Sequence, residues 1–236
     1  MEHLPPLEGS NTGGVWPPPP TNAIDDGRSR MLSLLSQYRS PVALSRWMLG
    51  FMGATVISDV SVTPLLMSGP SGKDSADTLS SLSNLPHFVA GILFLIWTYR
   101  LYKNLIVLGV SGLKFSPTIA VLMCVLPVLN LYQPVVIFGE IWRASALRET
   151  IARAGGRWKA VPSAPIIVCW WIAYLLYSVV AAILGKQEIK KATDLTPYAL
   201  LGVTSLVSGT LLTIVALRLN KREEARYIEI AASLKD

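Results

Sequence analysis

The run of residues from Pro165 to Leu184 contains no charged side chain. A stretch of about 20 mostly apolar residues is what an α-helix needs to cross the hydrocarbon core of a bilayer. The run from Tyr198 to Leu219 is nearly as apolar. Hydrophobic residues make up 51% of the chain and charged residues 15%, whereas soluble domains contain roughly 25% charged residues. The sequence therefore predicts an all-α integral membrane protein.

Three further apolar stretches precede these two runs, and the five together define a membrane domain over residues 42–220. The first candidate helix has Arg46 and Trp47 near its start, where a snorkelling cation and an interfacial aromatic side chain belong. Residues 221–236 are predicted to form a cytoplasmic C-terminal tail. The five stretches cover about 43–67, 85–110, 116–152, 165–184 and 198–219.

The stretch over 116–152 is broken in its middle. Pro127 and Pro134 each lack a backbone donor and disfavour the preceding helical turn, and Asn130 lies between them. Irregular backbone at membrane depth is tolerated only where protein or a water-filled cavity covers it. We therefore expect four transmembrane helices and a proline-broken helical hairpin that is re-entrant or interfacial. The alternative is a kinked fifth span.

The distribution of Lys and Arg favours the hairpin. Residues 143–159 and residues 218–236 carry five each, and cytoplasmic segments are the ones rich in Lys and Arg. A hairpin puts both segments on the side of the N-terminus, whereas a fifth span would put all ten charges outside. The sequence thus predicts a multi-pass protein of the cell membrane with both termini cytoplasmic and with loops 68–84 and 185–197 outside.

The N-terminal segment 1–41 contains seven of the sixteen prolines, including the run Pro17 to Pro20. Such a segment buries too little apolar surface to offset the entropy lost on ordering. We expect a disordered, proline-rich cytoplasmic tail that makes few contacts with the membrane domain. The proline run also suits the groove of an SH3- or WW-like cytoplasmic partner protein.

Polar side chains interrupt the apolar pattern near the middle of the chain. Trp97, Arg100 and Asn104 share one helix face, and Glu140 falls on an otherwise apolar helical stripe. We expect Arg100 and Glu140 to pair, with Asn104 and Asn130 satisfying their remaining donors and acceptors. The alternative is that Arg100 only snorkels into cytoplasmic headgroups. The predicted polar centre consists of Trp97, Arg100, Asn104, Pro127, Asn130, Pro134 and Glu140.

Two further patterns indicate packing surfaces. Apolar residues from Ile137 to Ile151 recur with helical period, which favours a helix lying along the cytoplasmic membrane surface over one that binds a partner. Small residues at every fourth position allow close helix packing, either within the bundle or in a homodimer. On the last two long stretches these small residues are Ser178 and Ala182, then Ser205, Gly209 and Thr213.

Four motifs follow one another between residues 94 and 145. They are W-x-x-R-x-x-x-N from Trp97, F-S-P from Phe115, L-P-V-L-N-L-Y-Q-P around Pro127, and E-I-W-R-A-S from Glu140. In this order they resemble the membrane family catalogued as domain of unknown function 4328. The chain departs from the family at 121–126, where the family more often has a Trp–Phe pair before the proline. The resemblance implies a multi-pass, mostly bacterial membrane protein, and it implies no activity.

Several activities find no support in the sequence. Gly69 to Gly72 match the GxSG of rhomboid-type proteases, but no intramembrane histidine follows Ser71, and no other nucleophile–base pair stands out. Neither a Walker A lysine motif nor HExxH or CxxC occurs, and the basic residues do not form an aromatic-interleaved face. We therefore expect no enzymatic activity, cofactor, metal or nucleic-acid partner. The expected role is a scaffold or sensor in the lipid bilayer; the alternative is a small channel or transporter with a polar site at the broken hairpin.

Overall fold

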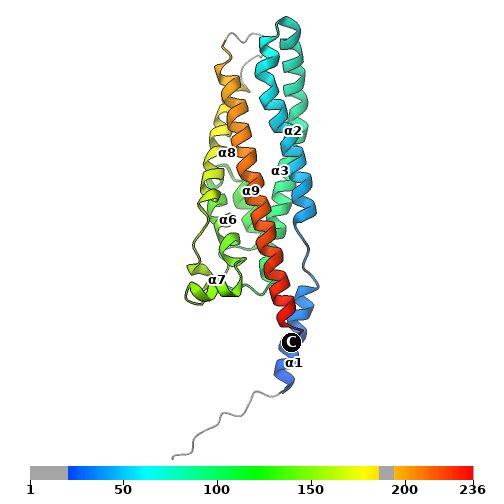
Figure 1. Cartoon of the computed structure of the whole chain (residues 1–236), viewed down its shortest axis with the longest axis vertical. Helices are drawn as coiled ribbons and strands as arrows, with labels where there is room; N and C mark the ends of the chain where they lie inside the picture. Colours follow the sequence, from blue (N-terminus) through cyan, green and yellow to red (C-terminus); the bar gives the residue numbers. More distant parts are fainter. Residues whose placement is uncertain (1–20, 186–193, 236) are drawn as a thin grey trace, which may run out of the picture.

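Four long helices form an elongated bundle in this computed structural model, which describes residues 21–185 and 194–235 (Figure 1). Each of the four is long and apolar enough to cross a membrane, and the described residues contain no strand. The all-α class and the four candidate spans are therefore as the sequence predicts. The long helices are α2 (Val42–Met67), α3 (Pro70–Val107), α8 (Pro165–Leu184) and α9 (Thr196–Ser233).

Helices α2 and α3 form an antiparallel pair joined by a tight turn at Gly69 (Figure 1). The prediction of a loop over 68–84 is wrong, because α3 begins at Pro70 rather than near residue 85. Its first turns carry many serines, yet they pack on the end of α2, where Ala76 is fully buried in a cluster with Val62. Tertiary contact thus extends the helix beyond its apolar stretch.

The chain between α3 and α8 folds into short helices. α4 and α6 contain nine and twelve residues, which is too few to cross a bilayer. α4 packs on α3 and α6 packs on α8, so the short helices fill the space between α3 and α8 over the lower part of Figure 1. The elements are α4 (Pro117–Val125), α5 (Pro127–Asn130), α6 (Gln133–Ala144), α7 (Arg148–Arg153) and the 3-10 helix η1 (Trp158–Ala160).

The predicted surface helix over 137–151 is wrong. α6 ends at Ala144 and α7 begins only at Arg148. Ile137 and Ile141 are fully buried in the main hydrophobic core instead of facing lipid headgroups. The apolar stripe therefore belongs to the interior of the bundle, because α3 and α8 offer it partners.

The N-terminal segment contributes helix α1 (Thr21–Leu35). Leu35 packs in a cluster with Leu108 and Ile230, and the Tyr38 ring stacks on Tyr227 with centroids 4.2 Å apart. Burial raises the pKa of the Tyr38 phenol, and the negative charges of nearby glutamates raise it further, by a smaller amount. The expectation of few contacts with the membrane domain is therefore wrong for this part of 1–41. The proline run at 17–20 and most of loop 185–197 lie outside the described residues.

Helix α9 continues well past the apolar run that ends at Leu219, so the predicted tail over 221–236 is helical up to Ser233. Its small residues face α2. A Cβ on Gly209 would lie 2.8 Å from Cγ2 of Val56, and Ser205 is buried. The small face of α9 is thus used inside the bundle.

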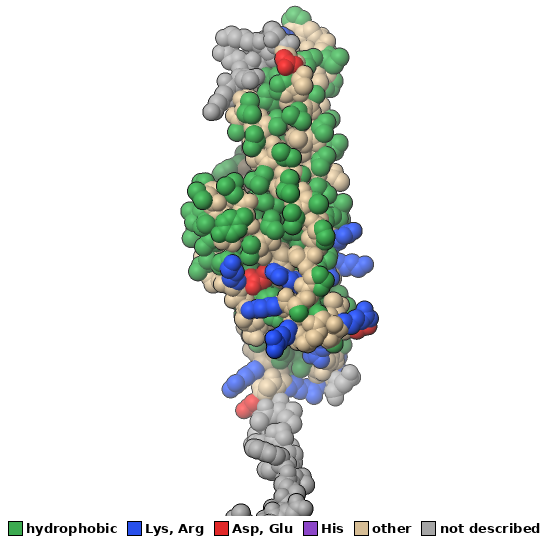
Figure 2. Space-filling model, turned by 90° about the vertical axis from the view of Figure 1, so that its left-hand side faces the viewer, with side chains coloured by type: hydrophobic (Ala, Val, Ile, Leu, Met, Phe, Trp, Pro, Cys, Tyr) green, Lys and Arg blue, Asp and Glu red, His purple; other side chains and the backbone are tan. Residues whose placement is uncertain are grey.

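The Lys and Arg side chains gather toward one end of the molecule (Figure 2). We call it the basic end; it is formed by residues 39–46, 100–114, 143–159 and 218–226. The opposite end, here the distal end, is formed by residues 59–87, 177–185 and 194–205. Pro64 and Pro86 lie inside α2 and α3 in this distal part. Each lacks the N–H that would bond to a carbonyl one turn earlier, which weakens the helical ladder there.

Candidate functional site

A cavity of about 590 Å³ lies at the distal end, with walls from all four long helices. It exists because the helices α4 to α6 reach only part of the way along α3 and α8, so the space beyond them stays unfilled. The described residues place no Lys or Arg in its lining. The polar lining residues are Thr55, Asp59, Asp77, Ser80, Ser81, Ser83, Asn84, His87, Tyr177 and Tyr198.

Asp59 is the buried acid of this cavity. Its side chain belongs to α2, is 7% exposed, and accepts a hydrogen bond of 2.6 Å at Oδ2 from Oγ of Ser205. It follows Arg46 by thirteen residues, about 20 Å along a helix, which is within the roughly 30 Å hydrocarbon thickness. No ion pair to Asp59 occurs in the described part of the chain. An acid at this depth is costly and generally marks a functional position.

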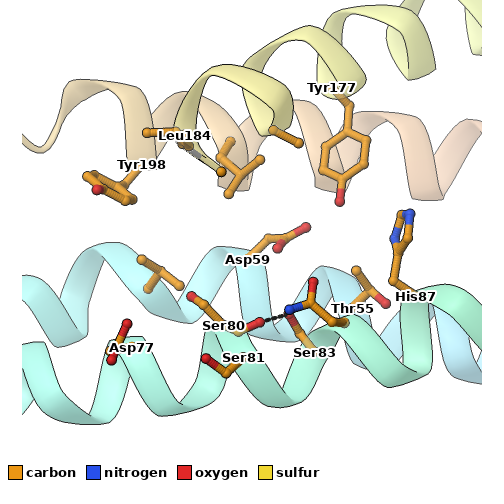
Figure 3. Close-up of a pocket in the computed structure, with 15 residues that line it drawn as sticks. Thr55, Asp59, Asp77, Ser80, Ser81, Ser83, His87, Tyr177, Leu184 and Tyr198 are labelled. Carbon is orange, nitrogen blue, oxygen red and sulfur yellow. Dashed lines mark hydrogen bonds between the residues drawn. The ribbon is translucent and has the colours of Figure 1, made fainter. Parts of the chain in front are cut away.

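His87 and Tyr177 face the same space as Asp59 (Figure 3). Their ring centroids are 6.2 Å apart. Within 21–185 and 194–235, Nδ1 of His87 and the hydroxyl of Tyr198 are buried and have no hydrogen-bond partner. The cavity therefore offers a carboxylate, an imidazole and two phenol rings to a guest molecule.

A second, more apolar cavity of about 310 Å³ meets the first at His87 and reaches Asn130 and Trp170. Beyond it, toward the basic end, aromatic rings pack with centroids 5.2–6.1 Å apart. These rings, an aromatic layer across the bundle, belong to Phe94, Trp97, Phe138 and Trp170. The two cavities are thus separated from the basic end by packed side chains.

Glu140 of the predicted polar centre is buried and fully engaged, but not by Arg100. Its Oε2 accepts from the Tyr102 hydroxyl at 2.5 Å, and its Oε1 accepts from the Lys114 backbone N–H at 2.8 Å. The Tyr102 hydroxyl in turn accepts from the Phe115 N–H at 3.1 Å. Glu140 therefore fastens α6 to α3 and to the connection that follows α3.

The predicted Arg100–Glu140 pair is wrong, because each side chain has other partners. Nη1 of Arg100 donates to the Ser40 carbonyl at 3.4 Å. Nδ2 of Asn104 donates to the Arg39 carbonyl at 2.8 Å, and its Oδ1 accepts from the Arg39 N–H at 3.4 Å. The Tyr102 hydroxyl and a backbone amide satisfy the Glu140 carboxylate. Arg100 and Asn104 instead hold the segment that leads into α2.

Trp97 is fully buried and contributes to a three-helix link. Its Nε1 donates to Oδ1 of Asn220 at 3.1 Å, and Nδ2 of Asn220 donates to Oγ of Ser45 at 2.7 Å. Helices α3, α9 and α2 are joined through these side chains.

The remaining predicted residues lie in the short helices between α3 and α8. Pro127 opens α5 and Pro134 lies in the first turn of α6, positions that suit proline. Asn130 ends α5 and lines the apolar cavity. Nε1 of Trp171 donates to the Leu131 carbonyl at 2.9 Å and so ties the connection between α5 and α6 to α8. The seven predicted residues therefore lie in separate places, not in one centre.

The cavity residues Asp59, His87 and Tyr177, and Ser205 that donates to Asp59, were not predicted as a site. The signals in the sequence are an isolated acid and an isolated histidine inside apolar stretches. The statement that no intramembrane histidine follows Ser71 is wrong, since His87 lies in α3. Ser71 and His87 both lie on α3, about 24 Å apart at 1.5 Å per residue, so they form no catalytic pair. The described residues contain no group of three potential metal ligands.

The comparison with protein families identifies a match over residues 73–224, described as Domain of unknown function (DUF4328). No curated protein and no solved structure matches the chain. The matched segment contains three walls of the cavity, from α3, α8 and α9, whereas Asp59 precedes it. Because the match covers more than half of the chain, the protein belongs to the DUF4328 family.

Proposed function

We propose that this protein is a non-enzymatic membrane sensor that binds a small organic cation in the distal cavity. The buried carboxylate of Asp59 carries the proposal: it has no ion pair in the described part of the chain, and a cationic guest supplies a counter-charge. The volume of about 590 Å³ suits a small molecule. The phenol rings of Tyr177 and Tyr198 supply faces that attract an ammonium group.

Helix α9 supports a sensing role. Near its start Tyr198 lines the cavity and Ser205 binds Asp59, and near its end Tyr227 stacks on Tyr38. A guest that draws on the Asp59 carboxylate competes with Ser205 and so shifts α9 relative to α2. That shift reaches the N-terminal segment, whose proline run is the proposed docking site for a cytoplasmic partner.

The second candidate function is transport. The observation in its favour is that His87 lines both cavities and that Asn130 of the broken hairpin lines the second. The aromatic layer with Trp97 and Phe138 argues against an open path to the basic end. We therefore favour sensing over conduction.

The proposed placement is in the cell membrane with both termini and the hairpin at the cytoplasmic side. The gathering of Lys and Arg at one end supports this orientation, and the distal cavity then opens outside. A homodimer remains an element of the proposal only through α8, where Ala182 is exposed, since the small face of α9 is covered.

Binding is tested with choline and its uncharged isostere 3,3-dimethylbutanol on the purified protein in nanodiscs. We expect choline to quench or shift Trp fluorescence saturably and to raise the thermal midpoint, and the alcohol to do neither. Asp59→Asn should weaken choline binding at least tenfold. The matched control is Asp74→Asn, an exposed acid at the same end that does not line the cavity.

Two outcomes would contradict the proposal. Equal binding of choline by Asp59→Asn and the unmodified protein would remove the carboxylate from the site. Uptake of labelled choline into proteoliposomes above the level of protein-free vesicles would favour the transporter instead.

A further inference from the structure

A separate cavity of about 400 Å³ lies at the basic end. Four parts of the chain surround it: the connection after α3, the end of α6, the segment from α7 to η1, and the last third of α9. Nε1 of Trp158 in η1 donates to the Ser111 carbonyl at 3.1 Å and so ties η1 to the connection after α3. The cavity is therefore built by fastened segments, and it is remote from the distal cavity discussed above.

The charge of this basic cavity is one-sided. Arg157, Lys159 and Arg226 line it, and no acidic residue does among the described lining. Glu229 pairs with Arg226 at 2.5 Å and also accepts from the Arg148 backbone N–H at 3.0 Å, which holds Arg226 in place. Neither Arg157 nor Lys159 has an ion pair in the described part of the chain. Two cations are thus left for an anion.

The backbone at Gly156 is open to close approach. Gly156 lines the cavity with φ of 77°, a conformation in which a side chain is unfavourable, and no atom lies within 4 Å of the place where its Cβ would be. The Lys159 ammonium lies over the Trp158 ring at 5.3 Å. A cation, an aromatic ring and bare backbone therefore meet in one small volume.

The remaining lining distinguishes a lipid from a free anion. Leu108 and Ile151 contribute apolar walls beside the cations. Trp158 is the type of side chain found at the level of lipid headgroups, and Lys and Arg side chains gather toward the basic end (Figure 2). Basic pockets on the cytoplasmic side of membrane proteins attract anionic headgroups. A phospholipid offers a phosphate to the cationic part of the lining and a glycerol backbone to the apolar part.

We propose that this basic cavity binds the phosphate headgroup of an anionic phospholipid. Arg157 and Lys159 neutralise the phosphate, Arg226 closes the site from α9, and the apolar walls receive the glycerol and first acyl carbons. Because α9 and the α7–η1 connection both line the cavity, a bound lipid links the last third of α9 to that connection. The site does not depend on the function proposed for the distal cavity.

The test uses native mass spectrometry of the full-length protein released from detergent with phosphatidylglycerol, phosphatidylcholine or inorganic phosphate added. We expect retention of one phosphatidylglycerol, little phosphatidylcholine, and no displacement by millimolar phosphate. Each Lys or Arg near a phosphate contributes about fivefold. Arg157→Gln/Lys159→Gln should therefore weaken retention about 25-fold, whereas Arg157→Lys/Lys159→Arg should keep it.

The matched control is Lys103→Gln/Arg153→Gln, which removes two exposed cations at the same end from outside the cavity. Retention by this control should equal that of the unmodified protein. An equal loss in both Gln pairs would reduce the effect to general attraction and overturn the proposal. Displacement of the lipid by inorganic phosphate, or equal retention of phosphatidylcholine, would overturn the assignment to an anionic lipid.

Discussion

Oγ of Ser205 and Oδ2 of Asp59 lie 2.6 Å apart, and this hydrogen bond joins α9 to α2 beside the distal cavity. The bond makes Asp59 a structural link as well as the ligand group of the proposed binding site. We therefore expect a change at either residue to affect stability as well as the proposed binding.

Ser205→Ala should destabilise the protein by about 1.5–3 kcal/mol, the range for a hydrogen bond to a charged group. The measurement is the free energy of unfolding in mixed micelles. Ser61→Ala is the control, because the Ser61 hydroxyl donates only to the Ile57 carbonyl of its own helix. Equal losses in the two variants would show that the link between α9 and α2 contributes nothing.

Gly209→Ala should cost about 1–3 kcal/mol, since the added Cβ would lie 2.8 Å from Cγ2 of Val56 and force α9 away from α2. Gly53→Ala, also inside a helix but with no atom within 4 Å of the new Cβ, should instead stabilise by up to about 1 kcal/mol. Thermal unfolding of both variants in the same detergent checks the opposite signs. A stable Gly209→Ala variant would contradict the close packing.

Two double-mutant cycles measure the coupling free energies within the polar network at the basic end. Tyr102→Phe with Glu140→Gln should show a coupling of about 1–3 kcal/mol, because the two side chains share a buried hydrogen bond. Arg100→Gln with Glu140→Gln should show less than about 0.5 kcal/mol. A large Arg100–Glu140 coupling would restore the ion pair expected from the sequence.

Tyr38→Ala should release the N-terminal segment and cost about 1–2 kcal/mol, because the stack on Tyr227 is lost. Limited proteolysis should then cut residues 26–40 faster than in the unmodified protein. Tyr99→Ala, which changes an exposed ring on α3, is the control and should leave the cleavage rate unchanged.

The proposed membrane topology is tested by introducing single cysteines into a Cys124→Ala/Cys169→Ala background. In intact cells a membrane-impermeant maleimide should label Ser71→Cys at the distal end and not Arg153→Cys at the basic end. Permeabilised cells should label both, which controls for reactivity. Labelling of Arg153→Cys in intact cells would contradict cytoplasmic placement of the hairpin.

Hydropathy and proline positions predicted the membrane class, the four spans and the broken stretch, because these depend on composition over whole segments. The bounds of α8 follow directly from its apolar run. The polar start of α3 was missed because its helix depends on contacts with α2. The partner of Glu140 was missed for a related reason: a tyrosine hydroxyl and a backbone amide carry no charge pattern that a sequence displays.

The cavity illustrates the same limit. Asp59, His87 and Tyr177 come from three helices, and they face one another in the space that the short helices α4 to α6 leave unfilled. No spacing along the chain encodes this arrangement.

Pro64 and Pro86 lie in the cavity half of the bundle, whereas the aromatic layer and the Trp97–Asn220 bond lie nearer the basic end. We consequently expect the distal end to be more flexible than the basic end. Amide hydrogen exchange should fall along α2 and α3 from the distal end inward. We therefore expect the proposed guest at Asp59 to move the distal ends of the four long helices while the part around the aromatic layer stays fixed, which amounts to a tilt of the cavity walls about that layer.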